Sequence, residues 1–410
     1  DFEVEYDWKN MLSEYTLEEE LPTWNEQEAV AVATLMLHCG VAVEMDYKST
    51  SSGAYTQNVI PAFCDYFGYD NGAVLRSRNL YTTAEWQEMI KKELDENRPV
   101  LYGGQTSLGS GHQFIVDGYA QTDDYFHLNW GWSGYGDGYY RLSGLKPVEG
   151  GTGGAGANLG YNYGQDAILG LQKAQKEAKI NNEIYFLNYN PPGISTSKPR
   201  RTFGLYTNVD YIIKDESFTF YYSFLYDYGM RDFTGEIALF LEDKTGKRKS
   251  QVWKVDMNKE VENGVLESGY TLYEDQGVEL TITEKVEEGD LLRMYYKPEG
   301  YEWRPIRGEK VTETLPVYAE SPVSNQVIQL EENIQVFPTR VQTGLTVYLP
   351  ETVIAQRILL HDMSGRLIKS ETIHTSDSDI YFSLSGQQPG IYILSIETSK
   401  GGSRHKIIKE

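Results

Sequence analysis

A histidine that opens one strand and an asparagine that closes the next are the residues of this sequence best suited to catalysis. His112 follows a glycine-rich turn in "SGHQFIVDGY", and Asn129 lies in "YFHLNWGW". A neutral imidazole can take a proton from a cysteine or serine nucleophile, provided that a third group fixes its tautomer. Cysteine, histidine and asparagine are one such set of nucleophile, base and orienting group. We therefore expect His112 to act as the base and Asn129 to accept a hydrogen bond from its ring.

The residues around this pair suit a peptide substrate. Gly109 and Gly111 would let a substrate backbone approach closely, because glycine has no side chain. Trp130 and Trp132 would shield the expected imidazole–amide hydrogen bond from water. A purely structural interpretation stays open. A single histidine on a strand is more often a structural hydrogen-bonding residue than a base, and two tryptophans are more often part of a hydrophobic core.

Other features near the pair are interpreted as structural. His127 is expected to be a structural histidine, and Asp117 faces away from His112 by strand parity. The glycine-rich run 151–156 matches G-x-G-x-x-G. It follows a proline-containing loop rather than a buried strand, so it predicts a flexible loop and not a dinucleotide site.

Composition excludes several classes of partner. The chain has 37 basic and 60 acidic residues and a formal net charge of −23, so a nucleic acid is not an expected partner. Its two cysteines, Cys39 and Cys64, have no metal-site spacing, so neither a metal nor a cofactor is expected. Apolar runs fall short of the roughly 18 residues of a membrane span, so no transmembrane segment is expected.

Helical patterns come first along the chain. "NEQEAVAVATLMLHCG" predicts a helix with Asn25 as N-cap, Glu28 completing a capping box, and Gly40 at its end. Its buried stripe is expected to be Ala29, Val32, Ala33, Met36 and Leu37. A later helix should bury Trp86, Met89, Ile90 and Leu94.

Strands follow these helices, which predicts an α+β domain over residues 1–175. Alternating runs with regular turns predict a β-sandwich over residues 180–320 and a second one over residues 327–410. The expected fold class is therefore an α+β domain followed by two all-β sandwich domains.

The first domain resembles the catalytic core of the streptopain-type, papain-like cysteine peptidases. The resemblance covers about residues 5–172 and rests on "GHQFIVDGY", "YFHLNWGWSGYGDGYYRL", "LMLHCGVAVEMDY", "SSGA" and "GTGGAGANLGYNYGQDAILGL". It implies His112 as catalytic base and Asn129 as its orienting partner. It also implies a substrate-binding set of Gly111, Trp130, Trp132, Ser52, Gly53 and Ala54. The loop 150–160 would cover the groove.

One feature of that family has no counterpart in these residues. The family's nucleophilic cysteine lies upstream of the "YDW" segment, whereas this chain begins at Asp1, close to that segment. Cys39 and Cys64 fall within expected helices, where each is interpreted as a small core residue. We therefore expect the nucleophile outside this chain, in an upstream segment that is itself an expected partner. Its absence should leave apolar surface uncovered near His112.

The last domain carries a second resemblance. "VFPTRVQTGLTVYLP", "MSGR", "QQPGIYIL" and "KIIK" are similar to the C-terminal sorting domain of type IX secretion substrates. This implies the secretion machinery as a partner, and a secreted or cell-surface location. An ordinary small sandwich is the alternative.

Together these features predict a secreted cysteine endopeptidase that cleaves proteins or peptides without a metal. The alternative is a catalytically inactive surface protein of the same fold that binds peptide or glycan. The amino-acid sequence upstream of Asp1 would distinguish the two.

Overall fold

A computed structural model describes most of the 410-residue chain. The described residues are 4–19, 21–49, 51–147, 159–175, 178–191, 203–229, 231–258, 264–267, 271–321, 334–350, 355–363, 365–375, 379–398 and 401–410. The chain divides into two compact units, residues 1–322 and residues 323–410. Within the first unit we distinguish an α+β part, residues 4–175, from a middle β-rich part, residues 178–321.

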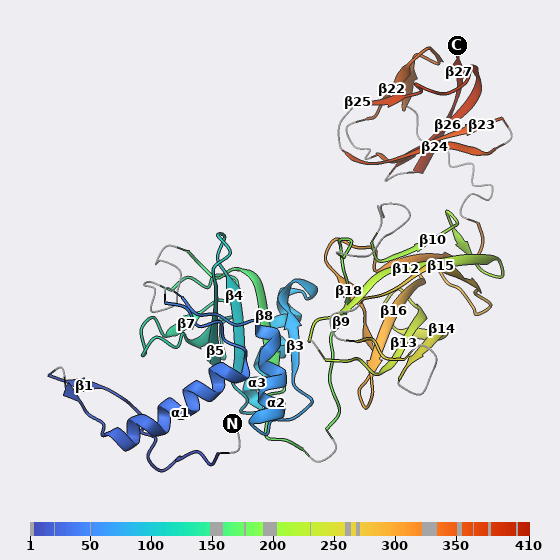
Figure 1. Ribbon diagram of the computed structural model, residues 1–410. Helices are drawn as coiled ribbons and strands as arrows, with labels where there is room; N and C mark the ends of the chain where they lie inside the picture. The colour runs from blue at the N-terminus through green and yellow to red at the C-terminus, as the bar shows by residue number, and fades with distance from the viewer. Residues whose placement is uncertain are drawn as a thin grey trace. The chain divides into compact units, whose positions relative to one another are not determined.

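Helices precede most strands in the α+β part, as the sequence predicted. Its elements are β1 (Leu17–Glu18), β2 (Leu21–Pro22), α1 (Glu26–Ala42), η1 (Thr56–Asn58), α2 (Val59–Tyr66), β3 (Val74–Ser77), η2 (Arg78–Leu80), α3 (Thr83–Asp95), β4 (Val100–Gln105), β5 (Gly111–Tyr119), β6 (Phe126–Asn129), β7 (Gly138–Tyr140) and β8 (Tyr163–Leu169). The strands β3-β8-β4-β5-β6-β7 form one antiparallel sheet (Figure 1).

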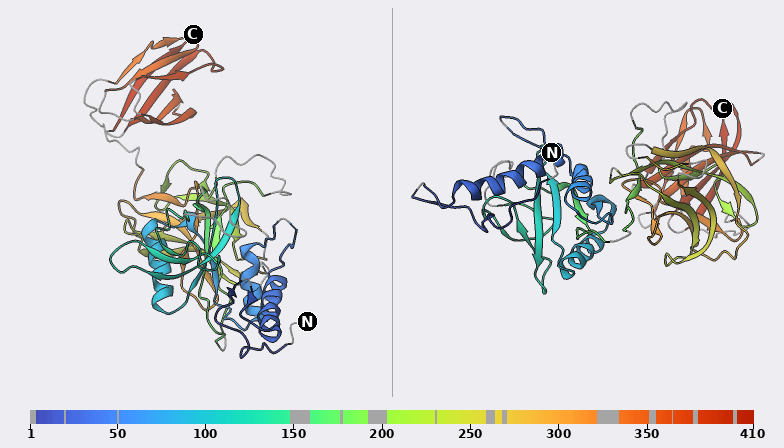
Figure 2. Two further views of the ribbon diagram at one scale, coloured as in Figure 1. Left: turned by 90° about the vertical axis from the view of Figure 1, so that its left-hand side faces the viewer. Right: turned by 60° about the horizontal axis from the view of Figure 1, so that its bottom comes forward.

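The first helix begins as predicted but buries a different face. Asn25 caps α1 and forms the expected capping box with Glu28. The helix continues past Gly40 to Ala42, so Gly40 does not end it; a side chain at residue 40 would instead collide with the hydroxyl of Tyr47. The predicted stripe is right only in part: Ala29 and Val32 are half-buried, but Ala33 is exposed, and Met36 and Leu37 are 67% and 56% exposed. Ala31 is buried instead. In Figure 2, α1 extends beyond the sheet, which leaves much of its surface uncovered.

Two hydrophobic cores lie on opposite faces of the sheet. Trp86 and Ile90 of α3 pack with Phe114 and Val116 of β5 in the first core, as predicted for α3. A second core joins α2 to the other face, through residues such as Ile60, Leu101 and Ile168. Because side chains alternate along a strand, residues 112, 114 and 116 face the first core, whereas residues 113 and 115 face the second.

The middle β-rich part has two sheets that share one core. Its strands are β9 (Ile184–Phe186), β10 (Leu205–Thr207), β11 (Ile212–Ile213), β12 (Ser217–Asp227), β13 (Gly235–Glu242), β14 (Arg248–Met257), β15 (Thr271–Thr281), β16 (Leu291–Pro298), β17 (Arg304–Pro305), β18 (Arg307–Gly308) and β19 (Thr314–Tyr318). One sheet has the order β10-β12-β9-β18, with β15 on β12. The other has the order β11-β19-β16-β13-β14, with β17 on β16.

The second unit is also built from strands. They are β20 (Gln335–Phe337), β21 (Arg340–Val341), β22 (Gly344–Tyr348), β23 (Ala355–Asp362), β24 (Leu367–Thr375), β25 (Asp379–Ser383), β26 (Gly390–Thr398) and β27 (Gly401–Lys409). They form the sheets β20-β22-β25 and β21-β27-β26-β23-β24, which enclose one hydrophobic core.

None of the helices in the described ranges is long and apolar enough to cross a membrane.

Candidate active site

His112 lies near the start of β5, where the chain leaves a tight turn. Gly109 has a φ of +83°, a conformation that residues with a side chain rarely adopt, so glycine is required there. From this turn β5 runs antiparallel to β4, with His112 opposite Gly104. The imidazole is half-buried and faces the core beneath α3. A rigid strand therefore carries the expected base.

The imidazole is oriented by a backbone carbonyl and not by the expected amide. Nε2 of His112 lies 2.8 Å from the carbonyl oxygen of Trp130. The expected direct contact with Asn129 is wrong, because Asn129 pairs with Ile115, three positions further along β5. The Asn129 Oδ1 atom accepts a hydrogen bond from the Gly131 N–H instead, at 2.9 Å.

This contact determines which ring nitrogen can act as a base. A carbonyl oxygen only accepts hydrogen bonds, so Nε2 of His112 must carry the hydrogen and donate it. The neutral ring is then unprotonated at Nδ1, and no hydrogen-bond partner for Nδ1 occurs among the described residues. Nδ1 is therefore the atom available to take a proton.

Two short polar contacts hold the carbonyl that orients His112. The N–H of Trp130 donates to Oδ1 of Asp137 at 2.8 Å, and the next N–H donates to Asn129. The first bond fixes the peptide group that precedes Trp130, and the second fixes the peptide group that contains the Trp130 carbonyl itself. The sequence analysis did not single out Asp137, although an aspartate in a glycine-rich turn commonly accepts nearby backbone hydrogen bonds.

Aromatic rings enclose the imidazole. The ring of Trp132 stacks on His112 with centroids 4.7 Å apart, and Trp130 stacks on Trp132 at 5.5 Å. Trp130 is 0% exposed and Trp132 is 7% exposed. The expected contact of Trp130 with a substrate is therefore wrong: this side chain packs behind the site, and only an edge of Trp132 is open. Tyr161, which the sequence did not single out, completes the wall at 5.6 Å from the imidazole.

Burial lowers the pKa of His112, and the hydrogen bond to the Trp130 carbonyl offsets part of this effect. We expect an NMR titration of the His112 Cε1–H resonance to give a midpoint below the ordinary value of about 6.5. The unfolded chain then binds more protons than the folded one between these two values. The free energy of unfolding should therefore fall as the pH drops below about 6.5, and less so for His112→Gln. A midpoint above 6.5 would contradict this reasoning.

The loop expected to bind substrate lines a hollow of its own. Ser52, Gly53 and Ala54 border a pocket of about 340 Å³ together with Asp46, Lys48, Ser51 and Tyr55. A backbone bridge between Asp46 and Gly53 closes this loop. Gly111 is exposed, and an added Cβ would meet only ordinary contacts, so the space beside it is open.

The two cysteines lie on helices and have raised pKa values. Burial raises the pKa of Cys39 on α1 and that of Cys64 on α2. The Cys64 thiol donates to the carbonyl of Asp70 at 3.3 Å, and Arg231 approaches its sulfur at 3.5 Å. Because a thiolate is the reactive form of cysteine, raised pKa values argue against either residue as a nucleophile.

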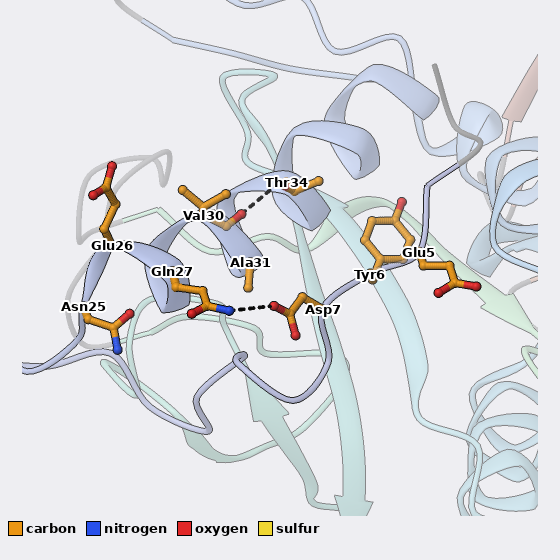
Figure 3. A pocket seen from close by; sticks show the side chains of 9 residues that line it. All are labelled: Glu5, Tyr6, Asp7, Asn25, Glu26, Gln27, Val30, Ala31 and Thr34. Atoms are coloured by element: carbon orange, nitrogen blue, oxygen red, sulfur yellow. Dashed lines mark hydrogen bonds between the residues drawn. The ribbon is translucent and has the colours of Figure 1, made fainter.

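A larger hollow lies elsewhere, between α1 and residues 5–7 (Figure 3). It has a volume of about 590 Å³, and its lining includes the carboxylates of Glu5, Asp7 and Glu26. Asp7 accepts a hydrogen bond from Gln27 across it at 3.5 Å. Its lining has neither an imidazole nor a thiol, so it offers no base or nucleophile for the expected reaction.

The remaining predictions near the site have mixed outcomes. Nδ1 of His127 forms a 2.6 Å hydrogen bond with Oδ1 of Asp117 on the neighbouring strand, which confirms local structural partners for both. No group of three or more metal-ligating side chains occurs within the described part of the chain. The loop 150–160 and the glycine-rich run 151–156 lie largely or wholly outside the described residues.

Comparison with known proteins shows what two segments of this chain are similar to. Residues 1–140 match the Peptidase C10 family, and residues 335–410 match the secretion system C-terminal sorting domain. Both resemblances expected from the sequence are therefore confirmed. A sorting domain of this kind indicates type IX secretion to the cell surface or the extracellular space.

Particular relatives of the first part are cysteine proteases. Streptopain of Streptococcus pyogenes is 36% identical over 168 residues, which are 41% of this chain and 40% of that protein. The thiol protease/hemagglutinin PrtT of Porphyromonas gingivalis is 37% identical over 152 residues, which are 37% of this chain and 17% of that protein. The chain thus spans about two fifths, or less, of the length of these curated relatives. Among solved structures, the interpain A cysteine protease of Prevotella intermedia is 37% identical over 41% of this chain and 65% of that chain, with a TM-score of 0.36.

Proposed function

We propose that this chain is part of a secreted cysteine endopeptidase in which His112 is the base and a protein or peptide is the substrate. The observation that carries the proposal is the hydrogen bond from Nε2 of His112 to the Trp130 carbonyl. It leaves Nδ1 as the basic nitrogen on a ring that aromatic side chains hold in place. The expected architecture is part of the proposal: a papain-like domain over residues 1–175, followed by sandwiches over residues 180–320 and 327–410.

The reaction is an acyl transfer through a thioester. A thiolate paired with protonated His112 attacks the peptide carbonyl carbon, and a C–S bond forms. The C–N bond then breaks as the proton on Nδ1 moves to the leaving amine. In the second half, Nδ1 takes a proton from water while the oxygen attacks the thioester. The C–S bond then breaks and the acid product leaves, which regenerates the thiolate beside His112 with the proton still on Nδ1.

The thiolate in this proposal comes from a cysteine other than Cys39 and Cys64. Both have pKa values raised by burial, and Cys64 belongs to the core on the sheet face opposite His112. Because residues 1–410 contain only these two cysteines, the nucleophile lies outside them. Exposed apolar side chains on α1, among them Val30, Leu37 and Val41, offer a surface that a further segment could cover.

Asn129 has a positioning role in this proposal. Its Oδ1 atom holds the Gly131 N–H, next to the carbonyl that binds His112. It acts on the imidazole through the backbone and not by direct contact. Gly111 and the loop 52–54 are proposed to face the substrate backbone, and Trp132 to border it.

The test compares the complete gene product with residues 1–410 in hydrolysis of a fluorogenic peptide. We expect hydrolysis by the complete protein and none by residues 1–410, because the latter have no activated thiol. His112→Ala in the complete protein should reduce kcat/KM by about a thousandfold or more, the contribution of a proton-transferring base and its nucleophile. A thiol-directed peptide inhibitor should label the complete protein, should label its His112→Ala variant less, and should not label residues 1–410.

His127→Ala is the matched control, since this histidine lies on the next strand and contacts Asp117. It should retain activity, as should Cys39→Ser and Cys64→Ser. Hydrolysis by residues 1–410 that is lost in Cys64→Ser would refute the assignment of the nucleophile. A complete protein that binds peptide or glycan but cleaves no peptide would favour the inactive binding protein instead.

A further inference from the structure

A buried polar row crosses the sheet beside the proposed active site. Gln113 on β5 and Asp166 on β8 are both in register with Gly103 on the strand between them, β4. A side chain at residue 103 would collide with Asp166 Oδ1 and with Gln113 Nε2. The glycine therefore provides the space in which the two polar side chains reach toward each other over β4.

Each end of this row is attached to another segment. Nε2 of Gln113 donates to Oγ1 of Thr56 at 2.6 Å, so the strand that carries His112 is bonded to η1. At the other end, the hydroxyl of Tyr228, in the middle β-rich part, donates to Oδ2 of Asp166 at 3.4 Å. Tyr228 also packs against the second hydrophobic core.

The position of Thr56 connects this row to the proposed substrate loop. Thr56 directly follows residues 51–55, which border the 340 Å³ pocket. Gln113 directly follows His112 in the chain. One hydrogen bond between Gln113 and Thr56 therefore joins the strand of the base to the loop that would hold the substrate.

The hydrogen bonds of the row are partly shielded from water, and Asp166 is its most buried member. Asp166 is 8% exposed, and burial raises its pKa to about 6, against smaller opposite effects from Thr56, Gln113 and Tyr228. Oδ1 of Asp166 and Oε1 of Gln113 are buried without a hydrogen-bond partner among the described residues. Such groups are costly in a fold, and their retention often reflects a functional requirement.

We propose that Gln113 and Thr56 are positioning residues, which hold the substrate loop 51–55 in register with His112, and that Asp166 and Tyr228 anchor this pair from behind. The inference rests on the proposed endopeptidase function and adds a residue pair that determines substrate binding. It implies that the middle β-rich part contributes to substrate affinity through Tyr228, although it holds none of the proposed catalytic groups.

The first experiment measures KM and kcat of the complete protein on the fluorogenic peptide. Thr56→Val keeps the shape of the side chain but removes the hydroxyl acceptor, so KM should rise about tenfold with kcat nearly unchanged. Thr56→Ser keeps the hydroxyl and should restore the wild-type KM. Tyr228→Phe should raise KM in the same direction by a smaller factor. Thr122→Val is the matched control, since its hydroxyl contacts only the neighbouring Asp123 in an exposed turn.

An unchanged KM in Thr56→Val would overturn the proposal. A fall in kcat with constant KM would overturn it as well, because the pair would then act on His112 rather than on the loop. A second measurement, amide hydrogen exchange of residues 53–56 in the 410-residue chain, needs no turnover. Faster exchange in Thr56→Val, with normal exchange in Thr56→Ser, supports the positioning role even if the complete protein proves not to be a peptidase. Equal exchange in all three proteins contradicts it.

Discussion

Replacing Glu183 with alanine is expected to destabilise the first unit by about 3–5 kcal/mol, because it leaves a buried guanidinium unpaired. The Glu183 carboxylate forms an ion pair with Nη1 of Arg76 at 3.0 Å, and the side chains of Glu183 and Arg76 are 4% and 8% exposed. The same Glu183 carboxylate accepts hydrogen bonds from the Tyr81 hydroxyl and, at 3.3 Å, from the Ser77 N–H. Its removal therefore also leaves two other donors without their acceptor.

The cluster lies where the α+β part meets the middle β-rich part. Arg76 is on β3, Glu183 precedes β9, and the hydroxyl of Tyr296 on β16 accepts from Arg76 at 3.1 Å. Nearby, Arg307 binds both carboxylate oxygens of Glu85 at 2.6 and 3.0 Å. Loss of Glu183 should thus weaken the association of the two parts as well as the fold of each.

Urea denaturation followed by tryptophan fluorescence can measure this effect. All seven tryptophans lie within residues 1–322, so the signal reports on the first unit alone. Glu299→Ala is the matched control: its 2.7 Å pair with Lys179 is about half exposed on each side and should contribute about 0–1 kcal/mol. The double variant Arg76→Met, Glu183→Gln should lower the free energy of unfolding by less than the sum of the two single changes. If Glu183→Ala lowers the free energy of unfolding no more than Glu299→Ala does, the buried pair contributes little to stability.

Deleting residues 401–410 is expected to abolish delivery to the cell surface. The deleted strand β27 lies between β21 and β26 in its sheet. It pairs with β26 along its full length and with β21 through residues 340 and 341. Ile407, which is fully buried in the core of the second unit, would be lost with it. Because a unit this small depends on each of its strands, we expect it to unfold and the protein to remain in the periplasm.

Point variants separate loss of folding from loss of a terminal sequence. Ile407→Asp places an unpaired charge in the core and should also block delivery, although the chain ends as in the wild type. Ile407→Val removes one methylene, costs about 0.5–1.5 kcal/mol and should be delivered normally. Surface labelling and cell fractionation in the native host would measure both. Normal delivery of the chain without residues 401–410 would exclude this unit as the sorting signal.

The middle β-rich part has a larger expected role than its lack of a catalytic group suggests. Through the Glu183 cluster it contributes to the stability of the α+β part, and through Tyr228 it reaches a polar row next to His112. Both effects act through contacts within the first unit. They predict that removing residues 203–321 would impair the α+β part even though no proposed catalytic residue is removed.

Local patterns in the sequence determined much of this protein. The capping box of Asn25 and Glu28 sets the start of α1, because its bonds are made within four residues of chain. Alternation along residues 113–119 predicted most of β5, and strand parity predicted that Asp117 faces away from His112, since side chains alternate in any strand. The motifs around His112 and in the last domain were specific enough to predict both family matches.

Only the tertiary structure decided how these elements work together. Strand register places Asn129 opposite Ile115, so the Trp130 carbonyl and not the amide orients His112. The exposed side chains of α1 follow from what packs on the helix, which its 3.6-residue pattern cannot specify. The row from Thr56 through Gln113 and Asp166 to Tyr228 joins residues up to 172 positions apart in the chain, that is, 228 − 56. No local pattern encodes such contacts, because they exist only once the sheet and the middle β-rich part have packed together.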